Sequence, residues 1–231
     1  MKLSILLPTH NRPILFHRCI LSVLKQLSDE IEVIVNNDSH DIKEIKHSQI
    51  SYHYEKFDNL SDIYKFLLSK ATGEYVYFLE DDDYLAPNFV EKLVFDADLI
   101  VGNYIPLYEV KNPIMFARLN QNAVYDNAGQ YVQTINVEHL QLSQYVFKRS
   151  IIEHFKFPQD NNVYNDYNLV LYAATQAERI KTTNQIYYYQ TTDGGDNLSF
   201  EGSATTVNVT RSLGFLSDYE IFKTTPFTTR P

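Results

Sequence analysis

This chain of 231 residues has little cysteine, little glycine and no long apolar run. One cysteine, Cys19, excludes an internal disulfide and suits a reducing compartment. No apolar stretch approaches the roughly 20 residues that span a bilayer, and the run after Met1 is too short for a signal peptide. These absences predict a cytoplasmic protein, either free in solution or peripheral at the inner face of the membrane.

Basic residues are also scarce, 20 against 29 acidic ones, and the formal net charge is −9. This balance argues against general nucleic-acid binding and against a broad basic membrane-binding surface. The seven glycines form neither a GxGxxG motif nor a P-loop lysine motif, so a dinucleotide site or an ATPase-type site is poorly supported. The length and apolar content suit one large domain, or a domain with a small appendage.

What is present is an alternation of strand-like and helix-like patterns over the first hundred residues. Strands are expected at Leu3 to Leu7, Ile31 to Val35, Ile50 to Tyr54, Tyr75 to Leu79 and Asp98 to Tyr104. Helical spacing connects Phe16, Ile20, Val23, Leu24 and Leu27, then Leu60, Ile63, Tyr64, Leu67, Leu68 and Ala71 before Gly73, then Phe89, Val90, Leu93 and Val94 after Pro87. This alternation predicts an α/β fold with a Rossmann-like, mostly parallel sheet and helices on both faces.

The second half of the chain is less regular. Residues 105–139 have no clear period, whereas a short helix is expected at Arg149 to Phe155 and another from about Tyr167 to Ala177, headed by Asn165-Asp166. Arg179 to Tyr189 is strand-like, and a last amphipathic helix is expected from about Ala204 to Phe222.

Four consecutive acids, Glu80, Asp81, Asp82 and Asp83, follow the apolar run Tyr75 to Leu79. Open α/β sheets bind their ligands at the carboxyl ends of strands, which is where these acids fall. Adjacent carboxylates repel one another unless a cation neutralises them, so the run indicates a hard divalent metal that holds a phosphate. The alternative is a solvated acidic turn.

These motifs, in this order, resemble the family 2 glycosyltransferases, which are inverting enzymes with the GT-A fold. The matching features are Ser4 to Pro13, the polar end of the second strand, Gly73-Glu74-Tyr75 before the acids, Pro87 after them, Phe147-Lys148-Arg149 on a helix, Phe157, Asn165-Asp166, and Tyr187-Tyr188-Tyr189 through Leu198-Ser199. The resemblance covers about residues 2 to 200. It implies a nucleotide-sugar-binding half over 1–104 and an acceptor-binding half over 105–200 of a single domain, with 201–231 as a C-terminal helical extension.

By this resemblance the acidic run is a DXD-type motif. Asp82 is expected to bind Mn²⁺ or Mg²⁺, with Glu80 and Asp83 as helpers and Asp81 as a nucleotide or metal contact. The first position departs from the commoner Asp. Asp166 is the expected general base, which takes the proton from the acceptor hydroxyl as it attacks, while the metal stabilises charge on the diphosphate leaving group.

The first loop and two later asparagines are the expected nucleotide contacts. Pro8, Thr9, Asn11 and Arg12 fall where the family's first loop wraps the nucleotide; Asn11 could equally cap the helix that Pro13 helps to start.

Asn37 lies where the family usually has an Asp that reads the uracil ring. Because an Asn can both accept and donate, uridine, thymidine, guanosine and cytidine donors all stay open. Asn59 lies near a family phosphate or base contact, but it also suits the cap of the next helix, which is the favoured interpretation.

The tail departs from the family pattern. Where the family has Tyr-x-Tyr-Arg-x-His, whose basic pair helps to hold the diphosphate, this chain has Tyr189-Gln190-Thr191-Thr192-Asp193. Three explanations stay open: another residue supplies the charge, Asp193 or Asp196 binds the metal, or the enzyme is weak or inactive.

The leading hypothesis is a metal-dependent inverting glycosyltransferase of the hexosyltransferase type. It would move a sugar from a nucleoside diphosphate sugar, with a UDP-sugar favoured, to a glycan or lipid-linked acceptor in surface polysaccharide synthesis. The first alternative is an inactive GT-A domain that acts as a nucleotide- or glycan-binding scaffold. The second is a nucleotidyltransferase, which should carry a glycine-rich basic loop after its first strand, and Pro8 to Pro13 lacks one.

Overall fold

The computed structural model describes residues 1–39, 42–107, 120–126, 128–132, 134, 140–157 and 165–191, with only the backbone at positions 165 and 166. Its strands are β1 (Leu3–Thr9), β2 (Ile31–Asn37), β3 (Ile50–His53), β4 (Tyr75–Phe78), β5 (Tyr84–Leu85), β6 (Leu99–Pro106), β7 (Ala123–Tyr125), β8 (Tyr145–Lys148) and β9 (Ile180–Gln190). Its helices are α1 (Pro13–Leu24), α2 (Leu60–Lys70), α3 (Phe89–Lys92), α4 (Ala128–Val132) and α5 (Asn165–Gln176), with single 3₁₀ turns η3 (Leu142–Gln144) and η4 (Arg149–Ile151).

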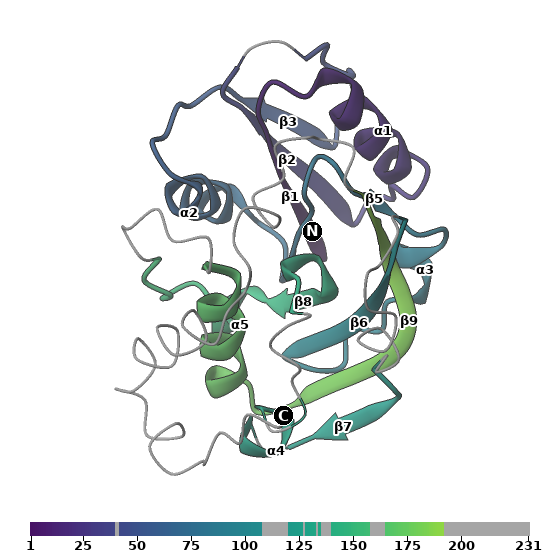
Figure 1. The fold of residues 1–231 in the computed structure, drawn as a ribbon, viewed down its shortest axis with the longest axis vertical. Coiled ribbons are helices and arrows are strands. Elements are labelled where there is room, and N and C mark those ends of the chain that lie inside the picture. Colours follow the sequence, from purple (N-terminus) through teal and green to yellow (C-terminus); the bar gives the residue numbers. More distant parts are fainter. Residues whose placement is uncertain are drawn as a thin grey trace.

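The strands form one sheet in the order β3-β2-β1-β4-β8-β6-β9-β5, and β7 pairs with the first residues of β9 (Figure 1). Strands β3, β2, β1 and β4 are all parallel. Strand β8 runs antiparallel between β4 and β6, and β6 is again parallel to β9. The longest ladders are therefore parallel, as the alternation of patterns predicts, and β1, β2, β4, β6 and β9 all end at the same edge of the sheet.

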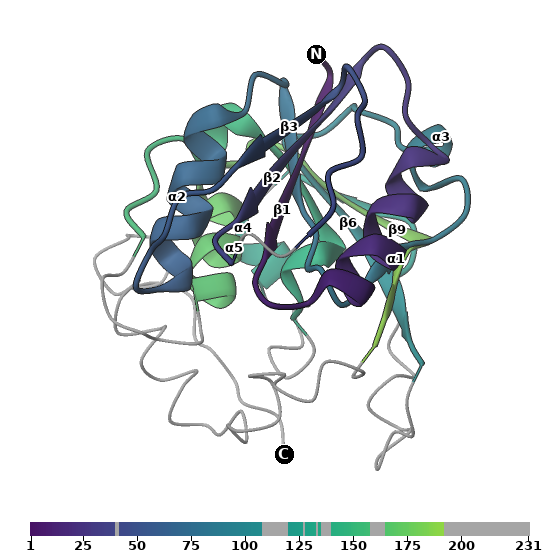
Figure 2. The same ribbon diagram turned by 90° about the horizontal axis from the view of Figure 1, so that it is seen from above.

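Helices cover both faces of this sheet, with α1 and α2 on opposite sides (Figure 2). Alternation along β1 explains the two layers. Leu3, Ile5 and Leu7 pack with α1, whereas Leu6 packs with α2 and α5. All four side chains are fully buried, so the sheet is apolar on both faces, as expected for parallel strands under crossover helices.

Gly73 fixes the start of β4 against β1. Helix α2 ends at Lys70, before the glycine that was expected to stop it. A Cβ at Gly73 would lie 2.7 Å from the backbone nitrogen of Ser4. The glycine N–H donates to the Ser4 hydroxyl at 2.8 Å, so its absent side chain is required by close packing.

Several expectations for local structure are wrong. Asn11 does not cap α1, because it adopts a left-handed backbone with φ of 50°, and Arg12 is the N-cap residue without a side-chain capping bond. Phe147 and Lys148 belong to strand β8 rather than to a helix, which is reduced to the turn η4. The helix after Pro87 is only four residues long.

Strands β5, β7 and β8 were not predicted. Each has only two to four residues, too few to show a period along the sequence. The expected helix at 204–222 and the 201–231 extension lie outside the described residues.

Candidate active site

The carboxyl edge of the parallel strands brings together the ends of β1, β2 and β4. Thr9, the last residue of β1, is paired in register with Asn37, the last residue of β2. The Thr9 hydroxyl donates to Asp81 Oδ2 at 2.7 Å, just beyond β4. Three positions predicted to contact the nucleotide thus form a row across three adjacent strands.

The acidic run continues the alternation of β4, which decides what each carboxylate faces. Tyr77 and Leu79 point to the α1 side, and Phe78 points to the α2 side. Glu80 follows on the α2 side, where it accepts a hydrogen bond from the Tyr64 hydroxyl. Asp81 turns back to the α1 side and to Arg12.

Arg12 forms ion pairs with two acids of the run. Its Nη1 lies 3.0 Å from Asp81 Oδ1 and 3.2 Å from Asp82 Oδ2. The side chains of Arg12, Asp81 and Asp82 are only 19%, 6% and 9% exposed. Removing one partner of an ion pair this deeply buried strongly destabilises the fold, because the remaining charge is left uncompensated.

Arg18, on α1, is a second arginine at the acidic run that was not predicted. Its Nη2 donates to the Asp82 carbonyl and, at 2.7 Å, to the Thr191 hydroxyl, while its guanidinium lies 5.3 Å from the centre of the Tyr84 ring. The Thr191 N–H donates to Asp83 Oδ1 at 2.9 Å. Asp83 is therefore tied to the end of β9, and no local sequence signal could reveal this because the partners are 108 positions apart.

Burial sets the electrostatics of the run. Burial raises the pKa of Asp81 to about 6, against the lowering effect of Thr9 and Arg12. Burial first, and then the charge of Asp82, raises the pKa of Asp83 well above its usual 3.8. Both pKa values are raised mainly by burial, and perturbed pKa values of this kind cluster at functional sites.

The donor chemistry fits a hard cation at two of the four acids. Asp81 and Asp82 converge on one positive group, the guanidinium of Arg12. Glu80 and Asp83 are directed to Tyr64 and Thr191 instead, and no set of three His, Cys, Asp or Glu side chains that could hold a metal occurs among the described residues. Magnesium is often held by one or two carboxylates together with substrate phosphates, and the Asp81–Asp82 pair fits that arrangement.

Polar contacts link the loop after β1 to the loop after β2. The Asn11 N–H donates to Ser39 Oγ at 2.9 Å, and His10 Nδ1 lies 2.5 Å from Asp38 Oδ1. Asn37 is fully buried, and its Oδ1 accepts from both the N–H and the hydroxyl of Ser39. Pro8 is buried within β1. The residues of this loop that contact the acids are Thr9 and Arg12.

Asn59 caps α2, as the favoured interpretation expected. Its Oδ1 accepts from the Asp62 N–H at 2.9 Å, and its Nδ2 donates to the Asp62 carboxylate at 2.9 Å. A contact between Asn59 and the nucleotide stays a prediction. Asp166 lies in the first turn of α5, but its side chain is outside the described part of the chain, so its role as a base also stays a prediction. Asp193 and Asp196 lie outside the described residues.

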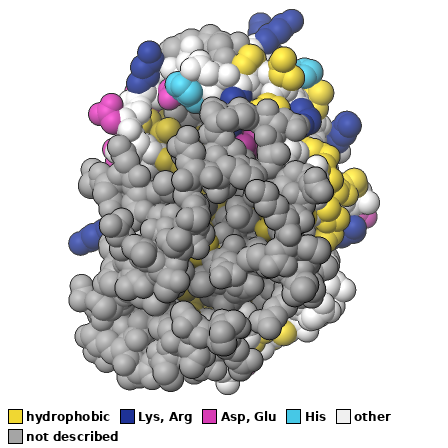
Figure 3. All heavy atoms as spheres, viewed as in Figure 1, with side chains coloured by type: hydrophobic (Ala, Val, Ile, Leu, Met, Phe, Trp, Pro, Cys, Tyr) yellow, Lys and Arg dark blue, Asp and Glu magenta, His cyan; other side chains and the backbone are white. Residues whose placement is uncertain are grey.

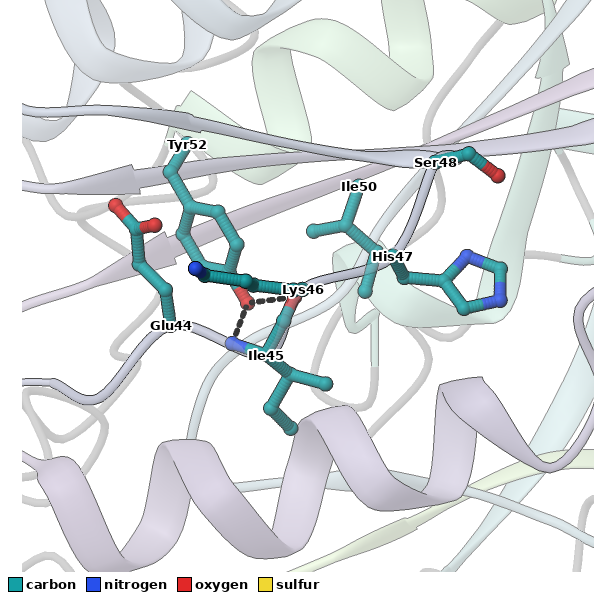
Figure 4. Close-up of a pocket in the computed structure, with 7 residues that line it drawn as sticks. All are labelled: Glu44, Ile45, Lys46, His47, Ser48, Ile50 and Tyr52. Carbon is teal, nitrogen blue, oxygen red and sulfur yellow. Dashed lines mark hydrogen bonds between the residues drawn. The ribbon is translucent and has the colours of Figure 1, made fainter.

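Two surface features lie apart from this edge. A hollow of about 490 Å³ is lined by Glu44, Ile45, Lys46, His47, Ser48, Ile50 and Tyr52 (Figure 4). It contains none of the predicted site residues. On the face shown in Figure 3, the described Lys and Arg side chains are scattered and do not gather into one patch.

Comparison with solved structures gives the class of fold. The chain is similar to TarS residues 1–349 of S. aureus in complex with UDP-GlcNAc, with a TM-score of 0.67 and 18% identity, over 94% of this chain and 66% of that one. It is also similar to the mannosyltransferase PcManGT of Pyrobaculum calidifontis in complex with GDP-Man and Mn²⁺, with a TM-score of 0.55 and 16% identity, over 82% and 56% of the two chains. The fold is GT-A.

Sequence comparison gives the family. The family model described as glycosyl transferase family 2 matches residues 4–155. The chain is 28% identical over 145 residues to glycosyltransferase GlyA of Streptococcus pneumoniae, covering 55% of this chain and 21% of GlyA. It is 32% identical over 109 residues to a GalNAc(5)-diNAcBac-PP-undecaprenol beta-1,3-glucosyltransferase of Campylobacter jejuni, covering 42% of this chain and 35% of that enzyme. The chain belongs to glycosyltransferase family 2, and it spans only a minor part of the length of these two relatives.

None of the described helices has the length and apolar character needed to cross a membrane.

Proposed function

We propose that this chain is an inverting glycosyltransferase that takes a sugar from a nucleoside diphosphate sugar. The observation that carries the proposal is the buried Asp81–Asp82 pair facing Arg12 at the carboxyl edge of the sheet, beside Thr9 and Asn37. A diphosphate is the kind of ligand that a cation held by these acids would bind. The UDP-GlcNAc and GDP-Man complexes of two proteins with this fold support a nucleotide-sugar donor.

Asp82, with Asp81 beside it, is the proposed site for Mn²⁺ or Mg²⁺, while Glu80 and Asp83 hold the acidic loop through Tyr64 and Thr191. The metal, when bound, stabilises negative charge on the leaving diphosphate. The chain's own part is to hold these carboxylates in place and out of water, where their interaction with a cation is stronger than at the surface.

Arg12 has two roles in this proposal. In the structure it neutralises the acid pair at 3.0 and 3.2 Å. With donor bound, its guanidinium is available to the phosphates, which it can contact through two N–H groups at once. Arg18, which donates to the Asp82 carbonyl and the Thr191 hydroxyl, is proposed to supply part of the positive charge that the tail lacks at positions 190–192.

Asp166 is the proposed general base, which takes the proton of the acceptor hydroxyl as that oxygen attacks the anomeric carbon. The bond from the anomeric carbon to the phosphate oxygen breaks as the new bond forms on the opposite face, so the configuration inverts. The acceptor is proposed to be a glycan or a lipid-linked sugar bound by the 105–200 half, in surface polysaccharide synthesis. The undecaprenol-linked substrate in the name of the C. jejuni relative supports the lipid-linked option.

The first experiment is a thermal-shift panel with UDP, GDP, dTDP and CMP and their common sugar conjugates, each with and without Mn²⁺. A ligand that binds only the folded state raises the Tm by an amount set by its concentration over Kd. We expect a shift that needs Mn²⁺ and disappears in Asp82→Ala. The absence of a shift with any nucleotide would favour the scaffold alternative, and glycan binding would be the next measurement.

A second experiment separates binding from chemistry. Asp166→Asn should keep the wild-type thermal shift with donor and lose transfer, because only the proton acceptor is removed. Wild-type turnover of Asp166→Asn on the true acceptor would show that another group is the base.

A further inference from the structure

Helix α1 carries a row of three polar side chains, Arg18, Ser22 and Gln26, which we call the α1 stripe. Arg18 and Ser22 lie one helical turn apart, and Gln26 follows in the turn that ends the helix. All three are half-buried, whereas the fully buried residues of the helix belong to the apolar core. Polar groups in such a setting are kept when they have hydrogen-bond partners, so the partners of the α1 stripe indicate its role.

Arg18 and Ser22 bond to the backbone of the acidic run and of the strand after it. Arg18 Nη2 donates to the Asp82 carbonyl. The Ser22 hydroxyl donates to the Cys19 carbonyl within α1 at 2.6 Å, so its oxygen is left to accept from the Leu85 N–H at 3.0 Å. The helix itself therefore fixes the polarity of the contact between Ser22 and β5.

Gln26 bonds to the next stretch of the same backbone. Its Nε2 donates to the Ala86 carbonyl at 3.0 Å and to the Ser22 carbonyl at 3.2 Å, and its Oε1 accepts from the Val90 N–H at 3.2 Å. An amide turned the other way would set its oxygen against two carbonyls, so these bonds fix its orientation. Gln26 thus ties the backbone between β5 and α3 to the end of α1.

The segment 82–90, to which the α1 stripe bonds, has little regular structure of its own. Strand β5 has two residues and helix α3 has four, so few of its backbone groups can be paired within an element. Pairing of β5 with β9 is one attachment. The α1 stripe is a second, and α1 and α3 lie on the same face of the sheet (Figure 2). The direction in which the acids project therefore depends on both attachments.

The same helix also begins next to the cation that pairs with the acids. Arg12 is the N-cap residue of α1, and its Nη1 lies 3.0 Å from Asp81 Oδ1 and 3.2 Å from Asp82 Oδ2. A regular helix holds attached groups more precisely than a loop does. Because α1 contacts the acids at its start and the backbone after them along its length, it sets where the two carboxylates meet.

We infer that Ser22 and Gln26 are positioning residues for the metal and the diphosphate. They hold the backbone after Asp82 so that the carboxylates of Asp81 and Asp82 converge on one cation. This inference rests on the proposed function and extends it to two side chains that bond to backbone rather than to the acids. Loss of a group that orients metal ligands typically costs about 10–100-fold in metal affinity. The alternative is that the α1 stripe stabilises the fold and has no effect on metal binding.

The test measures metal affinity, which a purely stabilising role would leave unchanged. UDP, GDP, dTDP and CDP are first compared by calorimetry in the presence of Mn²⁺, and the one that wild type binds best is then held at a fixed concentration while Mn²⁺ is titrated. The half-saturating Mn²⁺ concentration is compared for wild type, Gln26→Met and Ser22→Ala at a temperature where all are folded. Gln26→Met keeps the length of the side chain and removes both of its polar groups.

Gln144→Met is the matched control, because it makes the same change at another glutamine that bonds to backbone. Gln144 Nε2 donates to the Gly102 carbonyl at 3.3 Å, and its Oε1 accepts from the Gln141 N–H at 3.1 Å. Neither partner belongs to the acidic run or to the segment 82–90. The control therefore shows what the loss of comparable bonds does when the acids are not attached to them.

We expect the half-saturating Mn²⁺ concentration to rise about tenfold in Gln26→Met, to rise roughly threefold to fivefold in Ser22→Ala, and to stay within about twofold in Gln144→Met. An unchanged value in Gln26→Met would overturn the inference, since the α1 stripe would then contribute to stability alone. An equal rise in Gln144→Met would overturn it as well, because loosening the sheet elsewhere would have the same effect.

If Gln26→Met does not fold, the result with Ser22→Ala decides. Failure of the wild type to bind any of the four nucleotides, or binding that does not respond to Mn²⁺, would contradict the proposed function itself. Normal Mn²⁺-dependent binding by wild type, with unchanged metal affinity in the variants, would contradict this inference alone.

Discussion

The pKa values of carboxylates are shifted in opposite directions at the two edges of the sheet. At the edge where the parallel strands start, Glu32 accepts hydrogen bonds from Ser4, Thr72 and Gly73, and these outweigh its burial and lower its pKa. At the edge where the strands end, burial raises the pKa values of Asp81 and Asp83.

Asp98, at the start of β6, behaves like Glu32. Its carboxylate lies 2.9 Å from Lys148 Nζ and accepts the backbone N–H groups of Glu178 and Arg179 at 3.0 and 3.1 Å. These bonds outweigh its burial and lower the pKa. Glu32 and Asp98 at the first edge are therefore satisfied by hydrogen bonds within the chain and stabilise the fold. At the second edge, burial outweighs the hydrogen bonds and arginine charges that Asp81 and Asp83 receive, a perturbation that is typical of functional sites.

The largest expected effect is on transfer. Asp82→Asn should lower kcat/KM at least a hundredfold, which is typical when electrostatic stabilisation of a transition state is lost. Asp98→Asn is the matched control from the other edge, and it should keep wild-type kcat/KM at a temperature where it is folded. Equal losses in the two variants would mean that the edges do not differ in function.

Arg12→Gln should be next in size, with a loss of about 2–3 kcal/mol in the free energy of unfolding without divalent metal. This is below the roughly 3–5 kcal/mol typical of a fully buried pair, because the Arg12 side chain is 19% exposed. Since the acid pair is then left without its cation, Mn²⁺ or Mg²⁺ should raise the Tm of Arg12→Gln more than that of wild type. Denaturant unfolding measures the loss in stability, and thermal unfolding with and without metal measures the change in Tm. Equal metal effects on the two proteins would contradict the expectation that Arg12 and the ion compete for the acid pair.

Asp98→Asn should cost about 1–3 kcal/mol at pH 7, through weakened hydrogen bonds to a charged group. The pKa of Asp98 is lowered below 3.8 in the folded state, so the unfolded chain takes up a proton first as the pH falls. The stability that the carboxylate gives is thus present above its unfolded pKa and is lost as the pH falls through the folded pKa. Denaturant unfolding from pH 7 to pH 3 should show the gap between wild type and variant narrowing; a constant gap would assign the loss to packing.

Asn59→Ala should have the smallest effect, about 1 kcal/mol from loss of the α2 cap. If capping is its whole role, nucleotide affinity should not change, and Asn59→Ser, which can still cap, should recover most of the stability. A fall in nucleotide affinity in Asn59→Ser as well would reveal a contact with the donor. Calorimetric titration alongside thermal unfolding distinguishes the two.

By itself the sequence determined the parallel half of the fold and the edge at which the candidate site lies. Leu3 to Leu7, Ile31 to Val35 and Tyr75 to Leu79 are apolar runs joined by helical periods, and such patterns are local, so they can be read without knowing any partner. The same holds for the acids after β4 and for the cap at Asn59, which depends on a residue only three positions away.

Only the tertiary structure decided which of the four acids share Arg12 and which hydrogen-bond to other residues. Arg18 reaches Asp82 across 64 positions and Thr191 across 173. Strand β5, which follows the acids directly, pairs with the end of β9 and so brings Thr191 to the same edge. Ser22 and Gln26 likewise reach Leu85 and Ala86 across 63 and 60 positions. Contacts between distant residues leave no period along the chain, and for that reason the sequence indicated the edge of the site but not the partners of its side chains.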